Sequence, residues 1–236
     1  MQRTVFTSQS FKSVLGAVNR NGSVTACREP IRLITYLHSG SRVRGLKRDP
    51  ASYMLNPYGL TYESVNKKVG SQASQFFSKI RNQLTFNKFD IKIDDRLLLQ
   101  CFTHKSFAHG KVPYNEKLFI IGSHFLKVQA SLHSIKSTDS QNSSGLVNGM
   151  NFDTLGSYES KNLLAEPKLF KFMESLGLHE LVFWKKRDAS GTKIFNGEPK
   201  IVSSVLNSVV GAILLTNGVE KASLFVNNFL LREHTE

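Results

Sequence analysis

The feature that most constrains the fold of this chain is a series of apolar residues at helical spacing, within NEKLFIIGSHFL and the residues that follow it. These residues recur at steps of three and four, and they are Leu118, Ile121, Phe125, Val128 and Leu132. Such spacing aligns side chains on one face of an α-helix. It predicts a helix over residues 115–134 whose apolar stripe is buried in the core.

Helical patterns also dominate the rest of residues 49–236. Asp94 is a good N-cap for a helix over 95–101, and Gly177 is a good C-cap for a helix over 161–176. The Ser-, Asn- and Gly-rich segment 135–160 predicts a long loop. No strand alternation stands out, and the remaining predicted helices cover 62–81, 201–216 and 221–231, with a break at Asn217-Gly218.

Positive charge is concentrated near the start of the chain. The whole sequence of 236 residues has a formal net charge of +13, which points towards nucleic acid as a partner. Residues 1–48 hold nine basic residues and one acidic residue, which leaves 22 basic and 17 acidic residues, a net +5, for residues 49–236. Much of the basic character therefore belongs to residues 1–48.

Residues 1–48 have the composition of a targeting segment. They are rich in Arg and Ser, and their apolar residues from Val5 to Val18 share one face of a helix with the basic residues off that face. This pattern is typical of a mitochondrial presequence and predicts a location in the mitochondrial matrix. The alternative is a basic arm that stays attached and contacts RNA, and an early cleavage site would leave Arg32 to Arg48 as such an arm.

Neither a membrane span nor a disulfide framework is indicated. The most apolar stretch, 201–215, is interrupted by polar residues and is shorter than the roughly 18 residues that a span needs. The two cysteines are Cys27 and Cys101, and Cys27 lies within the predicted presequence. We therefore expect a reduced intracellular protein without a cysteine-based zinc site.

Three segments, in order, carry a family resemblance. They are LLLQCFTHKSFAHGKVPYNEKLFIIGSHFL, SYESKNLLAEPKLFKFMESLGLHELV and KIVSSVLNSVVGAILLTNGVEKASLFV. Together they resemble the endonuclease domain of the ribonuclease III family over most of residues 94–231. The chain is also similar to ribonuclease III-like proteins of the large subunit of fungal mitochondrial ribosomes. The resemblance implies an all-α fold of the endonuclease-domain type over residues 49–236.

The resemblance also implies a change at the family's catalytic site. The family hydrolyses RNA with Mg²⁺ held by four carboxylates, two on the signature helix and two on a late helix. Those positions correspond here to Phe119, Ser123, Ser204 and Asn207. None of them is a carboxylate, and Lys127 lies one turn beyond Ser123. We therefore expect no catalytic residues, no metal and no cofactor, and a protein that is not an enzyme.

Two sets of residues are candidates for binding. Lys185, Lys186 and Arg187 form a basic run that suits contact with RNA phosphates, although such a run is more often a solvated loop. In the family, the signature helix also lines a dimer contact. The resemblance therefore assigns a partner interface to Leu118, Phe119 and Ile120.

The function expected from these observations is that of a structural constituent of the mitochondrial large ribosomal subunit. It would be catalytically inactive and would contact ribosomal RNA and other proteins of that subunit. It would form a dimer with another ribonuclease III-like protein or with a copy of itself. The alternatives are an active endonuclease with a displaced metal site, and an inactive partner of a ribonuclease in mitochondrial RNA processing.

Overall fold

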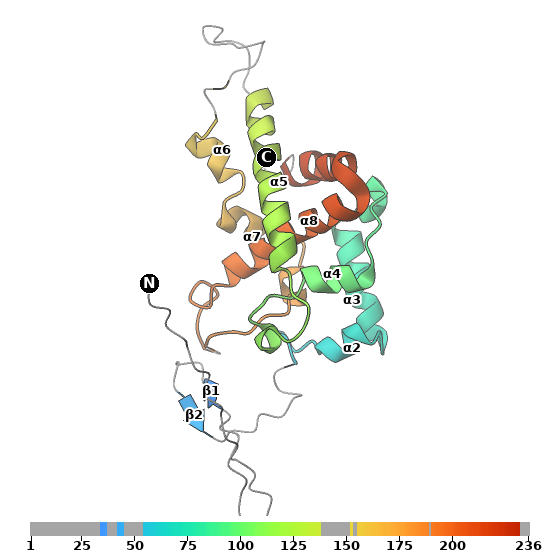
Figure 1. Ribbon diagram of the computed structural model, residues 1–236, viewed down its shortest axis with the longest axis vertical. Helices are drawn as coiled ribbons and strands as arrows, with labels where there is room; N and C mark the ends of the chain where they lie inside the picture. The colour runs from blue at the N-terminus through green and yellow to red at the C-terminus, as the bar shows by residue number, and fades with distance from the viewer. Residues whose placement is uncertain are drawn as a thin grey trace, which may run out of the picture.

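Two long helices that cross each other organise the fold. In the computed structural model, α5 spans Glu116–Ser137 and α8 spans Glu198–Phe225. Figure 1 shows α6 and α7 on one side of α5 and α2, α3 and α4 on the other. The structure describes residues 34–36, 42–44, 54–137, 152, 155–188 and 190–231. The body within this range is helical, which confirms the predicted all-α fold class.

Two glycines bring α5 and α8 into backbone contact. A Cβ atom placed on Gly122 would lie 1.8 Å from the carbonyl oxygen of Asn207, and one on Gly211 would lie 2.2 Å from that of Leu118. No side chain larger than hydrogen fits at either position without moving a helix. The crossing therefore holds the first turns of α5 beside the middle of α8.

The other elements are short. The α-helices are α2 (Tyr62–Asn66), α3 (Ser71–Gln83), α4 (Asp95–Cys101), α6 (Tyr158–Asn162) and α7 (Glu166–Ser175). The 3₁₀ turns are η1 (Phe86–Phe89), η2 (Phe107–Gly110) and η4 (His179–Leu181), and a π-helical turn, η5 (Val226–Leu231), follows α8. Strands β1 (Ile34–Tyr36) and β2 (Arg42–Arg44) pair antiparallel within residues 1–48. The predicted amphipathic helix of residues 1–48 lies outside the described residues.

Local signals placed several helix ends correctly. Asp94 accepts a hydrogen bond from the Arg96 N–H and caps α4, as predicted. Gly177 follows α7 with a φ of 62°, in the left-handed region expected of a C-terminal glycine. The predicted helix over 62–81 is instead two helices, α2 and α3. The positive φ angles of Lys68 (54°) and Gly70 (84°) break it.

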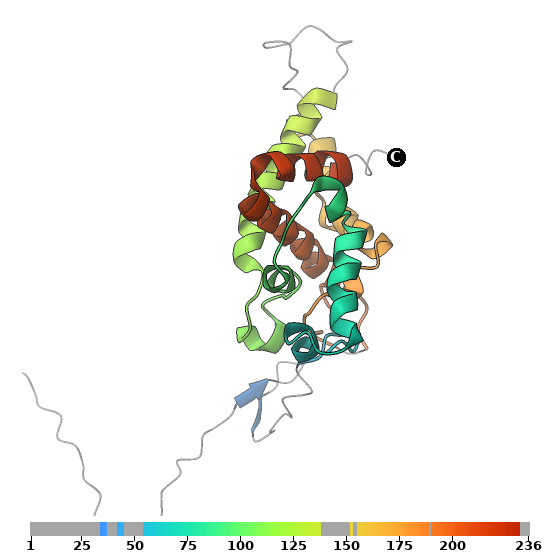
Figure 2. The ribbon, with the colours of Figure 1, turned by 90° about the vertical axis from the view of Figure 1, so that its right-hand side faces the viewer.

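The predicted burial of the α5 stripe is confirmed for Leu118 and in part for Phe125, which packs against the core, and it is wrong for the other three residues. Leu118 is buried, whereas Ile121, Val128 and Leu132 are 37%, 56% and 44% exposed. The crossing at Gly122 turns a different face of α5 towards α8, and that face contains Leu126, Gln129 and Ala130. Figures 1 and 2 show the C-terminal turns of α5 projecting beyond the other helices.

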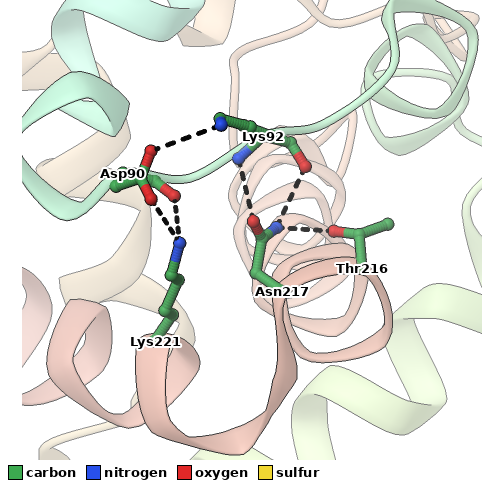
Figure 3. Close-up of polar contacts among 5 residues, drawn as sticks. All are labelled: Asp90, Lys92, Thr216, Asn217 and Lys221. Atoms are coloured by element: carbon green, nitrogen blue, oxygen red, sulfur yellow. Dashed lines mark hydrogen bonds and ion pairs between the residues drawn. The ribbon is translucent and has the colours of Figure 1, made fainter.

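A polar cluster fastens the bend in α8 to the loop before α4 (Figure 3). Gly218 adopts a φ of 85° inside α8, which confirms the predicted break at Asn217-Gly218. The side chain of Asn217 accepts a hydrogen bond from the Lys92 N–H (2.9 Å) and donates one to the Lys92 carbonyl oxygen (3.0 Å). The ammonium of Lys221 donates to the carbonyl oxygen and to the carboxylate of Asp90, both at 2.7 Å. We call these residues, with Thr216, the kink cluster.

The segment 198–231, which contains α8, has the length and apolar composition of a helix that can cross a membrane. In the structure, 56% of its most apolar stretch is buried inside the protein, as in the core helix of a folded domain. Length and composition are therefore weak evidence here. The expected absence of a membrane span stays a prediction.

Candidate functional site

A pocket of about 730 Å³ opens between α5, α7 and α8. Its walls combine apolar side chains with a few polar and charged ones. The lining residues used below are His104, Lys105, Asn115, Glu116, Phe119, Ser123, Lys127, Glu166, Lys200, Ser204 and Asn207. The close crossing of α5 and α8 fixes the relative position of two of the walls.

The four positions that the resemblance assigns to carboxylates line this one pocket. Phe119 and Ser123 come from α5, and Ser204 and Asn207 come from α8. All four are neutral, and all four are half-buried. The resemblance therefore identified two pairs of positions that the fold brings together. The pairs are far apart in the chain, since Phe119 and Ser204 are separated by 204 − 119 = 85 positions.

Their polar groups are mostly turned to their own helices. The Ser123 hydroxyl donates to the Ile120 carbonyl oxygen at 2.9 Å, and the Ser204 hydroxyl donates to the Ile201 carbonyl oxygen at 2.6 Å. Ser204 also accepts a hydrogen bond of 3.3 Å from the side-chain amide of the buried Asn115. The amide oxygen of Asn207 is buried and has no hydrogen-bond partner within the described part of the chain.

The charged residues of the pocket sum to a small positive charge. Three lysines (Lys105, Lys127 and Lys200) and two glutamates (Glu116 and Glu166) line it, a net +1 with neutral histidines. Lys105 is paired with Glu116 at 2.7 Å, and this hydrogen bond raises the pKa of Lys105 above its usual value. Lys127 and Lys200 make no ion pair among residues 54–137, 155–188 and 190–231.

These residues do not fit the family's magnesium site. Mg²⁺ prefers charged oxygen ligands in octahedral geometry, and Phe119, Ser123, Ser204 and Asn207 offer one aromatic ring, two hydroxyls and one amide. Across the part of the chain that the structure describes, no three His, Cys, Asp or Glu side chains gather as metal ligands do. We therefore derive no chemical step through a metal ion.

His104 holds the turn at the edge of the pocket. Its Nδ1 lies 2.9 Å from the Ser106 hydroxyl oxygen and accepts a hydrogen bond of 3.2 Å from the Ser106 N–H. Burial lowers the pKa of His104 below its usual value, so the ring is neutral near pH 7. The Ser106 hydroxyl also accepts a hydrogen bond from the Lys185 N–H at 3.2 Å. These contacts give His104 a structural role in this turn.

The predicted RNA-contact residues lie outside the pocket. Lys185 follows the η4 turn and is tied to Ser106 through its backbone. The ammonium of Lys186 lies 5.5 Å from the centre of the Tyr58 ring, and Arg187 is exposed. Contact of Lys185, Lys186 and Arg187 with RNA stays a prediction.

The three predicted interface residues have different environments. Leu118 is 6% exposed and packs in the core, so it does not reach the surface. Phe119 lines the pocket, and Ile120 is 49% exposed at its edge. A partner surface at this point would therefore consist of Ile120 and Phe119, and the interface itself stays a prediction.

The sequence patterns alone did not identify Lys200 and Glu166 as pocket residues. Both lie in the first turn of a helix, Lys200 in α8 and Glu166 in α7. Both lie within the segments that carry the resemblance, but at positions to which the resemblance assigns no role. No local signal could have found them, because only the packing of α5 and α7 against α8 brings them to the pocket.

Comparison with known proteins supports the fold. A family model described as "Ribonuclease-III-like" matches residues 94–234. A curated protein named Ribonuclease 3, from Shouchella clausii (strain KSM-K16), is 24% identical over 157 residues, which cover 64% of this chain and 53% of that protein. The chain thus spans about half the length of this relative.

One solved structure gives the same result for the fold. The crystal structure of the nuclease domain of ribonuclease III from Campylobacter jejuni has a TM-score of 0.51 and 23% sequence identity, covering 67% of this chain and 96% of that domain. A second structure of that domain, with a TM-score of 0.48, 23% identity and coverage of 65% and 96%, is described in terms of flexibility in the region of dimer formation. At this level of identity, the similarity concerns the fold.

Proposed function

Because the chain belongs to the ribonuclease-III-like family, whose model matches residues 94–234, we propose that it is an RNA-binding constituent of the mitochondrial large ribosomal subunit. In this role it contacts ribosomal RNA and neighbouring proteins of the subunit. The observation that carries the proposal is the chemistry of the pocket. The positions that the family motif gives to metal-binding acids hold Phe119, Ser123, Ser204 and Asn207. Two nearby lysines, Lys127 and Lys200, make no ion pair with any residue that the structure describes.

The expectation that the chain is not an enzyme is contradicted by the comparisons. The curated relative is named Ribonuclease 3, and the similar structure is the nuclease domain of a ribonuclease III. The family is thus one of endonucleases. Cleavage of RNA, with a role in mitochondrial RNA processing, is the second candidate function.

The mitochondrial location rests on residues 1–48. Their nine basic residues, single acidic residue and amphipathic pattern suit a matrix-targeting presequence, followed by the ribonuclease III-like domain over residues 49–236. A cleaved presequence would be visible as a shorter mature protein. Mass spectrometry of the protein purified from mitochondria gives its N-terminus directly.

Pairing with a second protein is supported by the uncovered face of α5. Ile120, Ile121, Val128 and Leu132 are each at least 37% exposed. Apolar residues that lie together at the surface of a folded chain commonly mark a protein interface. We propose that this face, together with Phe119, packs against another ribonuclease III-like protein or a second copy of this chain.

Sedimentation of a tagged chain tests the ribosomal role. A mitochondrial lysate is separated on a sucrose gradient after washing at high salt. A ribosomal constituent migrates with the large subunit in near-stoichiometric amount. Recovery in the light fractions contradicts the proposal.

A cleavage assay tests the second candidate. The purified protein is incubated with duplex RNA and Mg²⁺ or Mn²⁺. Cleavage supports the endonuclease. If the products instead match those of a protein-free control, the second candidate fails.

A further inference from the structure

Two unpaired ammonium groups flank the pocket from different helices. Lys127 belongs to α5 and Lys200 to the first turn of α8, and both are exposed. In contrast, the ammonium of Lys105 is already taken by Glu116 at 2.7 Å. The part of the chain that the structure describes thus provides two cations at the pocket without an acidic partner.

The neutral floor between these lysines changes which ligand the pocket prefers. Four carboxylates would repel a phosphate unless divalent cations bridged the two, because like charges at close range disfavour each other. Here Phe119, Ser123, Ser204 and Asn207 carry no charge, and the lining sums to +1. A phosphate can approach such a surface without a bridging ion.

We infer that this pocket binds a backbone phosphate of RNA directly, through Lys127 and Lys200, without a divalent cation. The inference deepens the proposed function, since it names the site of RNA contact, and it rests on that function for its choice of RNA as the ligand. Ammonium groups bind phosphates as point charges and need no fixed geometry. Lys127 and Lys200 therefore provide affinity without reading sequence.

Duplex RNA binding by the full chain tests this inference. Affinity for a fluorescent RNA duplex is measured in EDTA and in Mg²⁺ at matched ionic strength, for the wild-type protein and for Lys127→Gln/Lys200→Gln. The matched control is Lys88→Gln/Lys171→Gln, which removes the same charge from two exposed lysines that do not line the pocket. All four lysines are exposed, so the folded state is retained, and circular dichroism checks this.

The inference predicts equal wild-type affinity in EDTA and in Mg²⁺. The pocket variant loses about tenfold or more in affinity. For this variant, the slope of the logarithm of the binding constant against the logarithm of the salt concentration becomes shallower by about one for each lysine removed. The control stays within about twofold of the wild type. Four results would overturn the inference. They are wild-type binding that requires Mg²⁺, an equal loss of affinity in both variants, an unchanged affinity of the pocket variant, and no binding of the duplex at all.

The ribosomal role and the pocket inference can fail separately. Co-migration of the wild type with the large subunit, together with an unchanged affinity of the pocket variant, overturns the pocket and leaves the role standing. Metal-independent binding through Lys127 and Lys200 by a protein found only in light fractions supports the pocket and overturns the role.

Discussion

Two polar regions lie along α8, and they differ in how completely their groups are paired. In the kink cluster, Asn217 makes reciprocal hydrogen bonds with the Lys92 backbone, and Lys221 binds Asp90. In the pocket, the amide oxygen of Asn207 has no partner, and Lys127 and Lys200 have no ion pair within the described residues. The kink cluster is internally satisfied, and the pocket is not.

This difference separates a structural role from a binding role. Hydrogen bonds that are complete within the chain contribute to stability, because they hold the bend of α8 against the loop before α4. The exposed ammonium groups of Lys127 and Lys200, which have no ion pair within the described residues, remain available to a ligand. A buried polar atom without a partner, such as the amide oxygen of Asn207 within the same residues, costs stability. Charge alone therefore does not identify a site. Lys221 and Lys200 lie on the same helix, yet within the described residues only Lys221 has an acidic partner.

The largest expected effect is a loss of unfolding free energy when the close crossing of α5 and α8 is disturbed. Gly211→Ala should destabilise the protein by about 4 kcal/mol or more, because its Cβ meets the backbone of α5. Gly218→Ala in the kink has open space and suffers only from its positive φ, so it should cost about 2 kcal/mol. Urea denaturation compares the two, and equal losses would contradict a tight crossing.

Adding charge to the pocket tests its preference for anions. Ser123→Asp/Ser204→Asp should weaken duplex RNA binding in EDTA by about tenfold, or about 1.4 kcal/mol, since carboxylates then oppose the phosphate. Ser123→Asn/Ser204→Asn is the neutral control and should retain affinity. Fluorescence anisotropy measures both variants. Equal affinity of the acidic variant and the wild type would exclude phosphate from the pocket.

Asparagine substitutions on one helix compare the two regions directly. Asn217→Ala removes hydrogen bonds to Lys92 and Thr216 and should cost about 1 kcal/mol of unfolding free energy. Asn207→Ala removes an amide oxygen that has no partner among the residues that the structure describes, and it should cost about 0.5 kcal/mol or less. Thermal unfolding measures both, and a greater loss for Asn207→Ala would reverse the comparison.

The smallest expected effect concerns pH. Burial lowers the pKa of His104 below its ordinary value of 6.5, so the folded state favours the neutral ring. The stability contribution is complete above pH 6.5 and declines as pH falls from there through the lowered folded pKa. Unfolding midpoints measured from neutral to acidic pH should fall less steeply for His104→Gln than for the wild type. The control His124→Gln changes an exposed histidine, and its midpoints should follow those of the wild type. If the midpoints of His104→Gln fall as steeply as those of the wild type, another group causes the pH dependence.

Much of the fold could be predicted because its signals are local. Asp94 marks the start of α4, and Gly177 and Gly218 mark backbone turns, since capping and positive φ depend on neighbouring residues. The buried face of α5 could not be predicted in this way. It depends on Gly122 meeting Gly211, a contact between residues far apart in the chain, and apolar periodicity alone selected the wrong face.

The pocket was accessible to sequence reasoning only in part. The family motif located Phe119, Ser123, Ser204 and Asn207 on two helices that the fold brings together. The approach of α7 and the position of Lys200 depend on tertiary packing, so the charge balance of the pocket could not be read from the motif. The missing acids alone suggested a lost activity, an expectation that the comparisons contradict. The neutral lining and the lysines support our proposal of a different ligand chemistry.

The central claim, that the pocket holds RNA without a metal, can be tested by photo-crosslinking. A photo-reactive amino acid replaces Ser123 inside the pocket, or Lys88 outside it, and each protein is irradiated with labelled duplex RNA in EDTA and in Mg²⁺. The account predicts crosslinks from position 123, equal in both conditions and several-fold above those from position 88. Crosslinks from position 123 that appear only with Mg²⁺, or that merely equal those from position 88, would contradict it.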